Sequence, residues 1–337
     1  MTRSHRRGWP VVALLITSLL AACGAPAAAP TPTPIPPTST PRPELPPIAY
    51  TSELDGNFDI YLIRPDGLNQ QRVTQSAGLD WAPAISPDGT RLAFMSSRNG
   101  GQFDLFLLDI ARGVPGAEAN RLTALTNTRE SEYFPRWSPD GTQLVFHGYP
   151  PDSQVTQIYT LDVEKALADA DDAITRLTDQ PANDGYANFS PTGEEIVFVS
   201  ERDGNSELYV MNADGSNVRR LTDHVANDGF PAWHPDPNRR VIVFMSDRAG
   251  YFELYLLDLD RFDRGDSDAL TVLEQPNRLG LTGNPGDSAF PVFSPDGNQL
   301  VFANNVEIGY DIYVLDLLTN RISRLTFDIG DDLYPDW

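Results

Sequence analysis

One phrase recurs through this chain and constrains its fold more than any other feature. It combines aromatic residues, prolines and an Asp-Gly turn, and its fullest copies run from Phe134 to Gly141 and from Phe290 to Gly297. Counted from the first proline position, the copies start at residues 83, 135, 187, 231, 291 and 335, at intervals of 52, 52, 44, 60 and 44. A hydrophobic residue followed by threonine stands nine residues before each start, and these threonines are Thr74, Thr126, Thr178, Thr222, Thr282 and Thr326. Such regular spacing predicts a repetitive architecture.

Each repeat contains four short apolar runs separated by turns. The recurring phrase is expected to form the first strand, a run such as Leu144 to Phe146 the second, and Gln157 to Tyr159 the third. The hydrophobic-threonine pair is expected to mark the fourth strand. Four antiparallel strands in roughly 45 residues are typical of a propeller blade.

The two ends of the repeat region complement each other. Residues 48–74 match strands two to four but lack a first strand, whereas Leu333 to Trp337 match a first strand alone. Joining them in one blade leaves no free sheet edge. The sequence therefore predicts an all-β, six-bladed propeller over residues 48–337, with Trp337 buried beside residues 48–62.

These phrases resemble the repeats of the TolB propeller family over residues 48–337. The repeated Ser-Pro-Asp-Gly, the Phe/Met-Ser end of the second strand and the Asp-Gly turn before an acidic-Leu/Ile-Tyr step carry the resemblance. The chain departs from the pattern at Ala187, Thr192 and Pro237. The resemblance implies a propeller that meets partners near its channel and that can hold a divalent cation there.

The amino end has the features of an export signal. Arg3, Arg6 and Arg7 precede an apolar run from Val11 to Leu20, which is too short to cross a bilayer as a mature helix. The sequence then reads Leu-Ala-Ala-Cys-Gly, which resembles the lipobox of bacterial lipoproteins and implies lipid on Cys23. The alternative is an ordinary secretory signal. We expect a signal peptide over residues 1–22 and a lipidated Cys23 that opens a Pro/Thr/Ala-rich linker over residues 23–47.

Composition excludes several classes of function. The chain has 25 Lys and Arg against 47 Asp and Glu, a formal charge of -22, which argues against nucleic acid and anionic lipid as partners. Its single lysine is not part of a phosphate-binding loop, and its single cysteine excludes internal disulfides. No G-x-S-x-G, H-E-x-x-H or dinucleotide-binding glycine motif is present.

A repeated acidic position suggests a binding site. It lies three residues before each repeat start and is occupied by Asp80, Glu132, Asp184, Asp228 and Asp332, with Ser288 in the remaining repeat. Because the first strand of a blade is innermost, we expect these residues around one mouth of the channel. There they would bind a partner or a cation such as calcium, or they would only stabilise the turn that enters the strand. No metal ligand set is assigned.

Other repeated residues have mainly structural interpretations. Arg98, Arg202 and Arg248 follow second strands and are expected to pair with neighbouring acids. The second aromatic residues of the phrase are expected between blades; these are Trp137, Phe189, Trp233, Phe293 and Trp337. Three long segments between third and fourth strands are expected on the face opposite the acids, one of them running from Tyr255 to Thr282 and another with a short helix within 163–172.

Two functions from different classes remain open on the sequence. The first is a non-catalytic, membrane-anchored binding module of the cell envelope, a monomer on the outer face of a bacterial membrane that binds an envelope protein or a cell-wall component. The second is a propeller that binds or cleaves glycans, for which two carboxylates would suffice.

Overall fold

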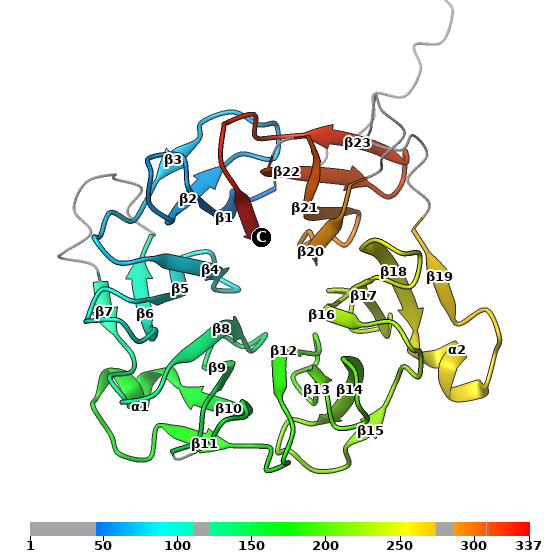
Figure 1. Ribbon diagram of the computed structural model, residues 1–337, viewed down its shortest axis with the longest axis horizontal. Helices are drawn as coiled ribbons and strands as arrows, with labels where there is room; N and C mark the ends of the chain where they lie inside the picture. Colours follow the sequence, from blue (N-terminus) through cyan, green and yellow to red (C-terminus); the bar gives the residue numbers. More distant parts are fainter. Residues whose placement is uncertain (1–44, 111–121, 152, 274–285, 308) are drawn as a thin grey trace, which may run out of the picture. The chain divides into compact units, whose positions relative to one another are not determined.

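Six four-stranded antiparallel sheets surround a central axis and form a six-bladed propeller (Figure 1). The computed structural model describes residues 45–110, 122–151, 153–273, 286–307 and 309–337. In these residues the only helices are two short ones, α1 (Val163–Leu167) and α2 (Leu259–Arg264). The predicted all-β class, blade number and strand number are confirmed.

The strands fall into four equivalent positions. The inner strands are β4 (Asp80–Ile85), β8 (Glu132–Trp137), β12 (Asp184–Phe189), β16 (Asp228–Trp233), β20 (Ser288–Phe293) and β24 (Asp332–Asp336). The second strands are β1 (Ile48–Ser52), β5 (Arg91–Ser96), β9 (Gln143–Gly148), β13 (Glu195–Ser200), β17 (Val241–Ser246) and β21 (Gln299–Glu307). The third strands are β2 (Asp59–Ile63), β6 (Asp104–Asp109), β10 (Gln157–Asp162), β14 (Glu207–Asn212), β18 (Glu253–Asp258) and β22 (Gly309–Asp316). The outer strands are β3 (Gln71–Arg72), β7 (Leu122–Ala124), β11 (Ile174–Arg176), β15 (Arg219–Arg220), β19 (Leu270–Val272) and β23 (Arg321–Arg324).

Each blade has one aromatic pair at its centre. The second strand contributes a fully buried ring, such as Phe94 or Phe198, which lies directly across from an aromatic residue of the third strand. Ring centroids are 6.0 Å apart for Phe94 and Phe106 and 5.8 Å apart for Phe198 and Tyr209. Cross-strand aromatic pairs stabilise a sheet beyond the area they bury, which explains why this spacing is kept in all six blades.

The Ser-Pro-Asp-Gly phrase forms the turn from the inner to the second strand. In β8–β9, Ser138 Oγ donates to Asp140 Oδ1 at 2.5 Å, and the same oxygen accepts from Thr142 N at 3.1 Å. Gly141 has a φ of 70°, a conformation that glycine adopts without steric cost. The phrase is thus a self-bonded turn that fixes where each inner strand ends.

The two chain ends share one blade, as predicted. β24 pairs antiparallel with β1, with Asp336 opposite Ala49 and Leu333 opposite Thr51. Trp337 is 8% exposed and packs in a cluster with Ile48, and its Nε1 donates to the Pro46 carbonyl at 3.0 Å. Adjacent inner strands contact one another around the whole ring, β24 with β4 included. The ring is therefore closed by the carboxyl-terminal strand.

The outer strand of the fifth blade differs from the prediction. β19 pairs with β18, with Val272 opposite Tyr255, and Leu273 N donates to the Leu254 carbonyl at 3.0 Å. That bond matches the one from Leu221 N in the preceding blade. The strand was expected at Thr282, which lies outside the described residues. The prediction was wrong, because Leu270–Val272 form the outer strand, and the β-branched Thr271 and Val272 favour a strand conformation at the edge of β18.

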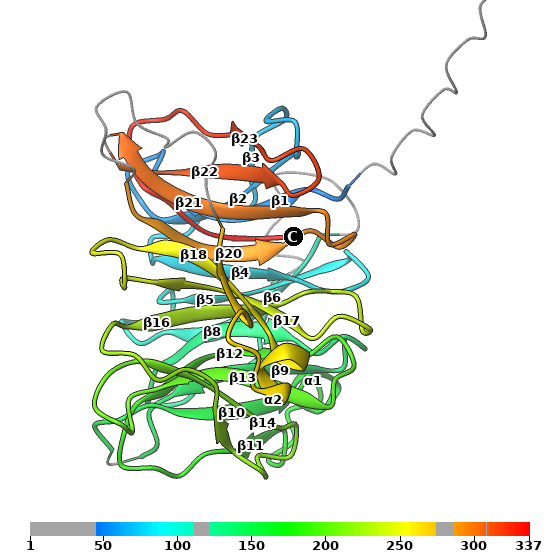
Figure 2. The same ribbon diagram turned by 90° about the vertical axis from the view of Figure 1, so that its right-hand side faces the viewer.

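The connections define two faces. The mouth face consists of the connections that leave second strands and those that enter inner strands, such as 97–103 and 75–79. The turn face consists of the Ser-Pro-Asp-Gly turns and the connections that contain α1 and α2, and Figure 2 shows both helices toward the same side. The predicted short helix is present as α1. No helix among the described residues is long and apolar enough to cross a membrane.

Candidate functional site

The predicted acidic position is the first residue of every inner strand, and three of its six residues form ion pairs with arginine. Distances between the guanidinium and carboxylate are 2.8 Å for Arg98–Asp80, 3.1 Å for Arg202–Asp184 and 2.7 Å for Arg248–Asp228. These carboxylates are fully buried. The predicted pairing of the arginines with neighbouring acids is confirmed.

A serine and two rings complete each arginine site. In the second blade, Ser96 Oγ donates to Asp80 Oδ1 at 2.5 Å and accepts from Arg98 Nε at 2.8 Å. The Arg98 guanidinium also lies 5.4 Å from the Phe94 ring centroid and 4.9 Å from that of Phe106. Cation–π contacts and charge-assisted hydrogen bonds of this kind compensate the cost of burying the charges. This arrangement ties the inner strand to the connection that follows the second strand.

Among the described residues, no arginine pairs with Glu132 or Asp332. Glu132 instead accepts from Thr126 Oγ1 at 2.9 Å and from Thr128 Oγ1 at 2.5 Å. Burial raises the pKa of Glu132 to about 7 and that of Asp332 to about 6. One carboxylate oxygen of Asp332 is buried and accepts no hydrogen bond within the described residues. These two acids are therefore protonated much more readily than an exposed carboxylate.

The sixth blade replaces the charge with a neutral pair. Ser288 Oγ accepts from Asn304 Nδ2 at 3.0 Å, and the preceding Asp287 accepts from Phe252 N at 2.9 Å. All six positions therefore lie on the mouth face and bond within the propeller framework. In the part of the chain that the structure describes, no three His, Cys, Asp or Glu side chains are grouped so as to hold a metal ion. A partner or a calcium ion at these carboxylates stays a prediction.

The first aromatic residue of the phrase was assigned no role, and it lines the channel. Five blades contribute one such ring, and these residues are Phe134, Tyr186, Phe230, Phe290 and Tyr334. Ring centroids lie 4.1 Å apart for Tyr186 and Phe230, and 4.3 Å apart for Phe290 and Tyr334. Phe134 of β8 and Tyr334 of β24 are 5.1 Å apart, although β4, which carries Ala82, lies between their strands in the ring. We call these five side chains the channel cluster.

A β-bulge directs these rings inward. Each residue of the channel cluster has a φ of about 50° to 58°, a conformation that non-glycine residues rarely adopt, and the strand register shifts at this point. The second blade carries Ala82 at this position, and the Ala82 N–H donates to Thr51 Oγ1 at 3.1 Å. An aromatic residue at the first position of the phrase in five of six repeats, directly before proline in four of them, was the signal in the sequence, but the bulge was not visible there.

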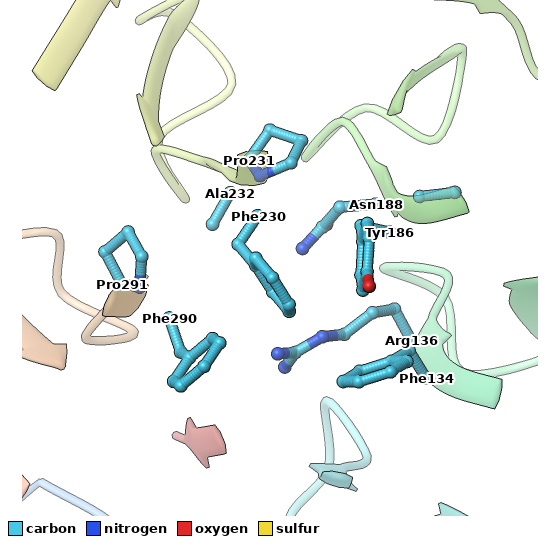
Figure 3. A pocket seen from close by; sticks show the side chains of 10 residues that line it. Phe134, Arg136, Tyr186, Asn188, Phe230, Pro231, Ala232, Phe290 and Pro291 are labelled. Atoms are coloured by element: carbon cyan, nitrogen blue, oxygen red, sulfur yellow. The ribbon is translucent and has the colours of Figure 1, made fainter. Parts of the chain in front are cut away.

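Arg136 lies behind the channel cluster, toward the turn face. Figure 3 shows its guanidinium directed between the rings of Phe134, Phe230 and Phe290. It forms an ion pair with Asp336, which also accepts from Ile85 N at 2.7 Å. The space left among these side chains is only about 20 Å³. The channel cluster and this ion pair thus fill the middle of the channel.

A hollow lies on each side of the channel cluster and the Arg136–Asp336 ion pair. The one on the turn face has a volume of about 480 Å³ and is bounded by Arg136, Asp336 and Asp88. The one on the mouth face has a volume of about 330 Å³, and Phe134 and Tyr186 form part of its wall. Of these two hollows, the one on the mouth face is lined by rings of the channel cluster.

The inter-blade aromatic residues are structural, as expected. Nε1 of Trp137 donates to the Ala84 carbonyl at 3.0 Å, and Nε1 of Trp233 donates to the Asn188 carbonyl at 3.3 Å. Both are at most 8% exposed, as are Phe189, Phe293 and Trp337. These residues do not form an exposed platform for sugars.

The histidines lie apart from one another. His147 is stacked on Phe134 at 5.5 Å, accepts from Tyr186 N at 3.2 Å, and burial lowers its pKa to about 3. His234 is buried on the turn face, and His224 is exposed on the mouth face. His147 and His224 therefore lie on the mouth face, and His234 lies on the turn face.

Sequence comparison decides the family. The TolB beta propeller domain matches residues 116–220 and 187–288, which together span just over half of the chain. The chain belongs to the TolB beta-propeller family. An uncharacterized protein of Agrobacterium fabrum is 32% identical over 65% of this chain and 67% of its own length. A TolB homolog of Chlorobium luteolum is 37% identical over 55% of this chain, but the match spans only 39% of that relative.

Solved structures agree with the propeller fold. TolB from Acinetobacter baumannii superposes with a TM-score of 0.68 at 20% identity, over 87% of this chain and 66% of that one. The fold by itself does not decide between a binding module and an enzyme, because oligogalacturonate lyase shares it at 16% identity and a TM-score of 0.54, over 82% of this chain and 72% of that one.

Proposed function

We propose that this TolB-like propeller is a lipid-anchored, non-catalytic binding module of the bacterial envelope. Its mouth face would bind an envelope protein or a cell-wall component. The observation that carries the proposal is the mouth-face hollow of about 330 Å³, whose wall includes half-buried rings of the channel cluster. Aromatic rings that remain accessible in a concave surface are typical of binding sites.

Exposed apolar side chains on the same face support the proposal. Val225, Phe327 and Ile329 lie in connections that enter inner strands and are 93%, 69% and 94% exposed. Phe327 and Ile329 lie in the connection that enters β24, the strand that closes the ring. At the end of that connection, Glu53 N donates to the Asp331 carbonyl at 3.2 Å. Exposed apolar groups around a concave centre fit a protein partner better than a free surface.

The described side chains favour binding over catalysis. The carboxylates of Asp80, Asp184 and Asp228 are occupied by arginine, and His147 is held neutral by burial. A glycan-cleaving site needs two carboxylates on either side of the sugar, and among the described residues that line the mouth-face hollow only Glu201 carries one. A glycan ligand without cleavage is the alternative, because tyrosine rings also stack on sugars.

Charge substitutions on each face test the proposal. Ile329→Asp places a charge on the mouth face, and Leu318→Asp does the same at a 74% exposed residue outside it. Each lipidated variant is purified from solubilised membranes, and bound proteins are identified and quantified against the parent; a second arm measures sedimentation with isolated cell wall. We expect Ile329→Asp alone to lose its bound component. Loss in Leu318→Asp alone would contradict the assignment of the mouth face.

A further inference from the structure

The mouth-face hollow is built from two neighbouring blades. Tyr133 and Phe134 of β8, with His147 and Tyr149 at the end of β9, form one wall. Tyr186 of β12 and Glu201, which directly follows β13, belong to the other.

Five aromatic rings meet at this hollow, and they differ in orientation. The Tyr133 and Tyr149 rings are 6.2 Å apart and nearly perpendicular, at 82°. The His147 ring lies 5.6 Å from Tyr133 and 5.0 Å from Tyr186. Tyr133, Tyr149 and Tyr186 are all partly exposed. Rings at such angles present both edges and faces to a group that enters between them.

Gly185 makes room for the hollow. The equivalent residues of the two preceding blades are Trp81 and Tyr133. A Cβ atom at Gly185 would meet the His147 ring at 3.4 Å. The small residue therefore lets the histidine ring approach the backbone and leaves the space open where the two preceding blades carry a large side chain.

The electrostatics of the hollow select the ligand. Its lining includes the exposed Glu201 carboxylate, held by Asn183 Nδ2 at 2.7 Å, and among the described residues it contains no lysine or arginine. His147 is uncharged at neutral pH, because burial lowers its pKa to about 3. Burial and the Glu201 charge raise the pKa of Tyr186, so the carboxylate acts on this phenol as well. Ring faces beside one carboxylate attract a cation and offer nothing to an anion.

We propose that the hollow between Tyr133, Tyr149, Tyr186 and Glu201 binds an alkylammonium group, the lysine side chain of the partner that docks on the mouth face. This rests on the proposed function. The chain's own lysine is an unsuitable occupant, because Lys165 lies in α1 on the turn face and pairs with Asp172 at 2.6 Å. The ammonium must therefore come from another molecule, either a protein or a free amine.

Titration of the purified propeller tests the inference without knowledge of the partner. The probes are tetramethylammonium chloride, acetyl-Gly-Lys-Gly-amide and the neutral acetyl-Gly-norleucine-Gly-amide, at constant ionic strength, followed by NMR shifts of the protein. Both ammonium probes are expected to saturate the site, and the norleucine peptide is expected to bind at least about fivefold more weakly.

Variants of the site and one control sharpen the test. Glu201→Gln and Tyr149→Leu should each weaken binding of the ammonium probes by roughly fivefold to tenfold. Glu194→Gln, a carboxylate change at an exposed residue on the turn face of the same blade, should leave binding unchanged. Equal binding of the lysine and norleucine peptides, or unchanged binding in Glu201→Gln, would overturn the inference.

The arms separate the two sources of the ammonium and the two proposals. Binding of tetramethylammonium without the lysine peptide would assign a free quaternary amine and overturn the lysine assignment. If no probe binds while Ile329→Asp still loses its bound component, the inference fails and the proposed function stands. If the probes bind while Ile329→Asp retains its bound component, it is the proposed face that fails.

Discussion

At the scale of single residues, one sequence position performs three different tasks. The first residue of the inner strand is paired with arginine in three blades, is bonded without arginine as Glu132 and Asp332, and is neutral as Ser288. The sequence predicted both the shared face and the arginine pairing. The acids that are not paired with arginine are those of the blades in which Pro150 or Leu54 replaces arginine two positions after the second strand.

The buried Glu132 predicts a pH-dependent stability. Its pKa rises from the ordinary value of 4.5 to about 7 on folding, so the folded chain holds the proton more tightly than the unfolded chain. The resulting stabilisation is complete below about pH 4.5 and is lost as the pH rises through 7. Glu132→Gln removes this dependence. As the pH rises from 5 to 8, the free energy of unfolding of the parent should fall by on the order of 2 kcal/mol relative to that of the variant. Urea melts at several pH values measure it, with Glu194→Gln as a control, and parallel curves would contradict it.

The arginine pairs predict a loss of stability that calcium does not reverse. Asp184→Asn with Asp228→Asn leaves Arg202 and Arg248 without their carboxylates, and breaking such a pair typically costs about 3 kcal/mol. Melting is measured with and without millimolar calcium for the parent and the double variant. We expect a large fall in Tm and no calcium effect on either protein. Calcium stabilisation of the parent that disappears in the variant would instead establish a cation at the mouth.

At the scale of strands, the carboxyl-terminal strand β24 is the element that closes the molecule. The blade that β24 completes could be predicted from the sequence, because the repeat at residues 48–74 lacks only a first strand. The position of the outer strand β19 could not be predicted, because it depends on pairing with the edge of β18 and not on the spacing of the threonine motif. The inward bulge of the channel cluster was equally invisible, since it is a property of backbone conformation.

Removal of β24 should destabilise the whole ring. Deleting Leu333 to Trp337 exposes the edge of β1 and removes a buried tryptophan, and loss of a buried Trp side chain alone costs about 3–5 kcal/mol. We expect a clear drop in Tm by calorimetry, and a smaller drop for Trp337→Ala, which keeps the strand. Leu318→Ala, at an exposed residue, serves as the control. A truncated protein that melts with the parent would contradict closure by the chain ends.

At the scale of the whole molecule, the sequence predicts export, an anchor and a linker that carries an acidic propeller away from the membrane. The anchor residue, Cys23, lies outside the described residues and stays a prediction. Cys23→Ser should move the protein from the membrane fraction to the soluble fraction and leave the precursor uncleaved. Thr40→Ser in the linker is the matched control. Normal cleavage and membrane fractionation of Cys23→Ser would contradict lipid anchoring.

A lipid-anchored propeller that binds its partner through the mouth face should contact that partner with the residues exposed on this face. A photo-crosslinking residue at position 329 probes that face, and the same residue at position 318 probes a surface outside it; both native side chains are exposed. The measurement is the yield of crosslinked envelope product on illumination of intact cells, followed by identification of that product. We expect a defined product from position 329 and none from position 318. A product from position 318 alone would contradict it.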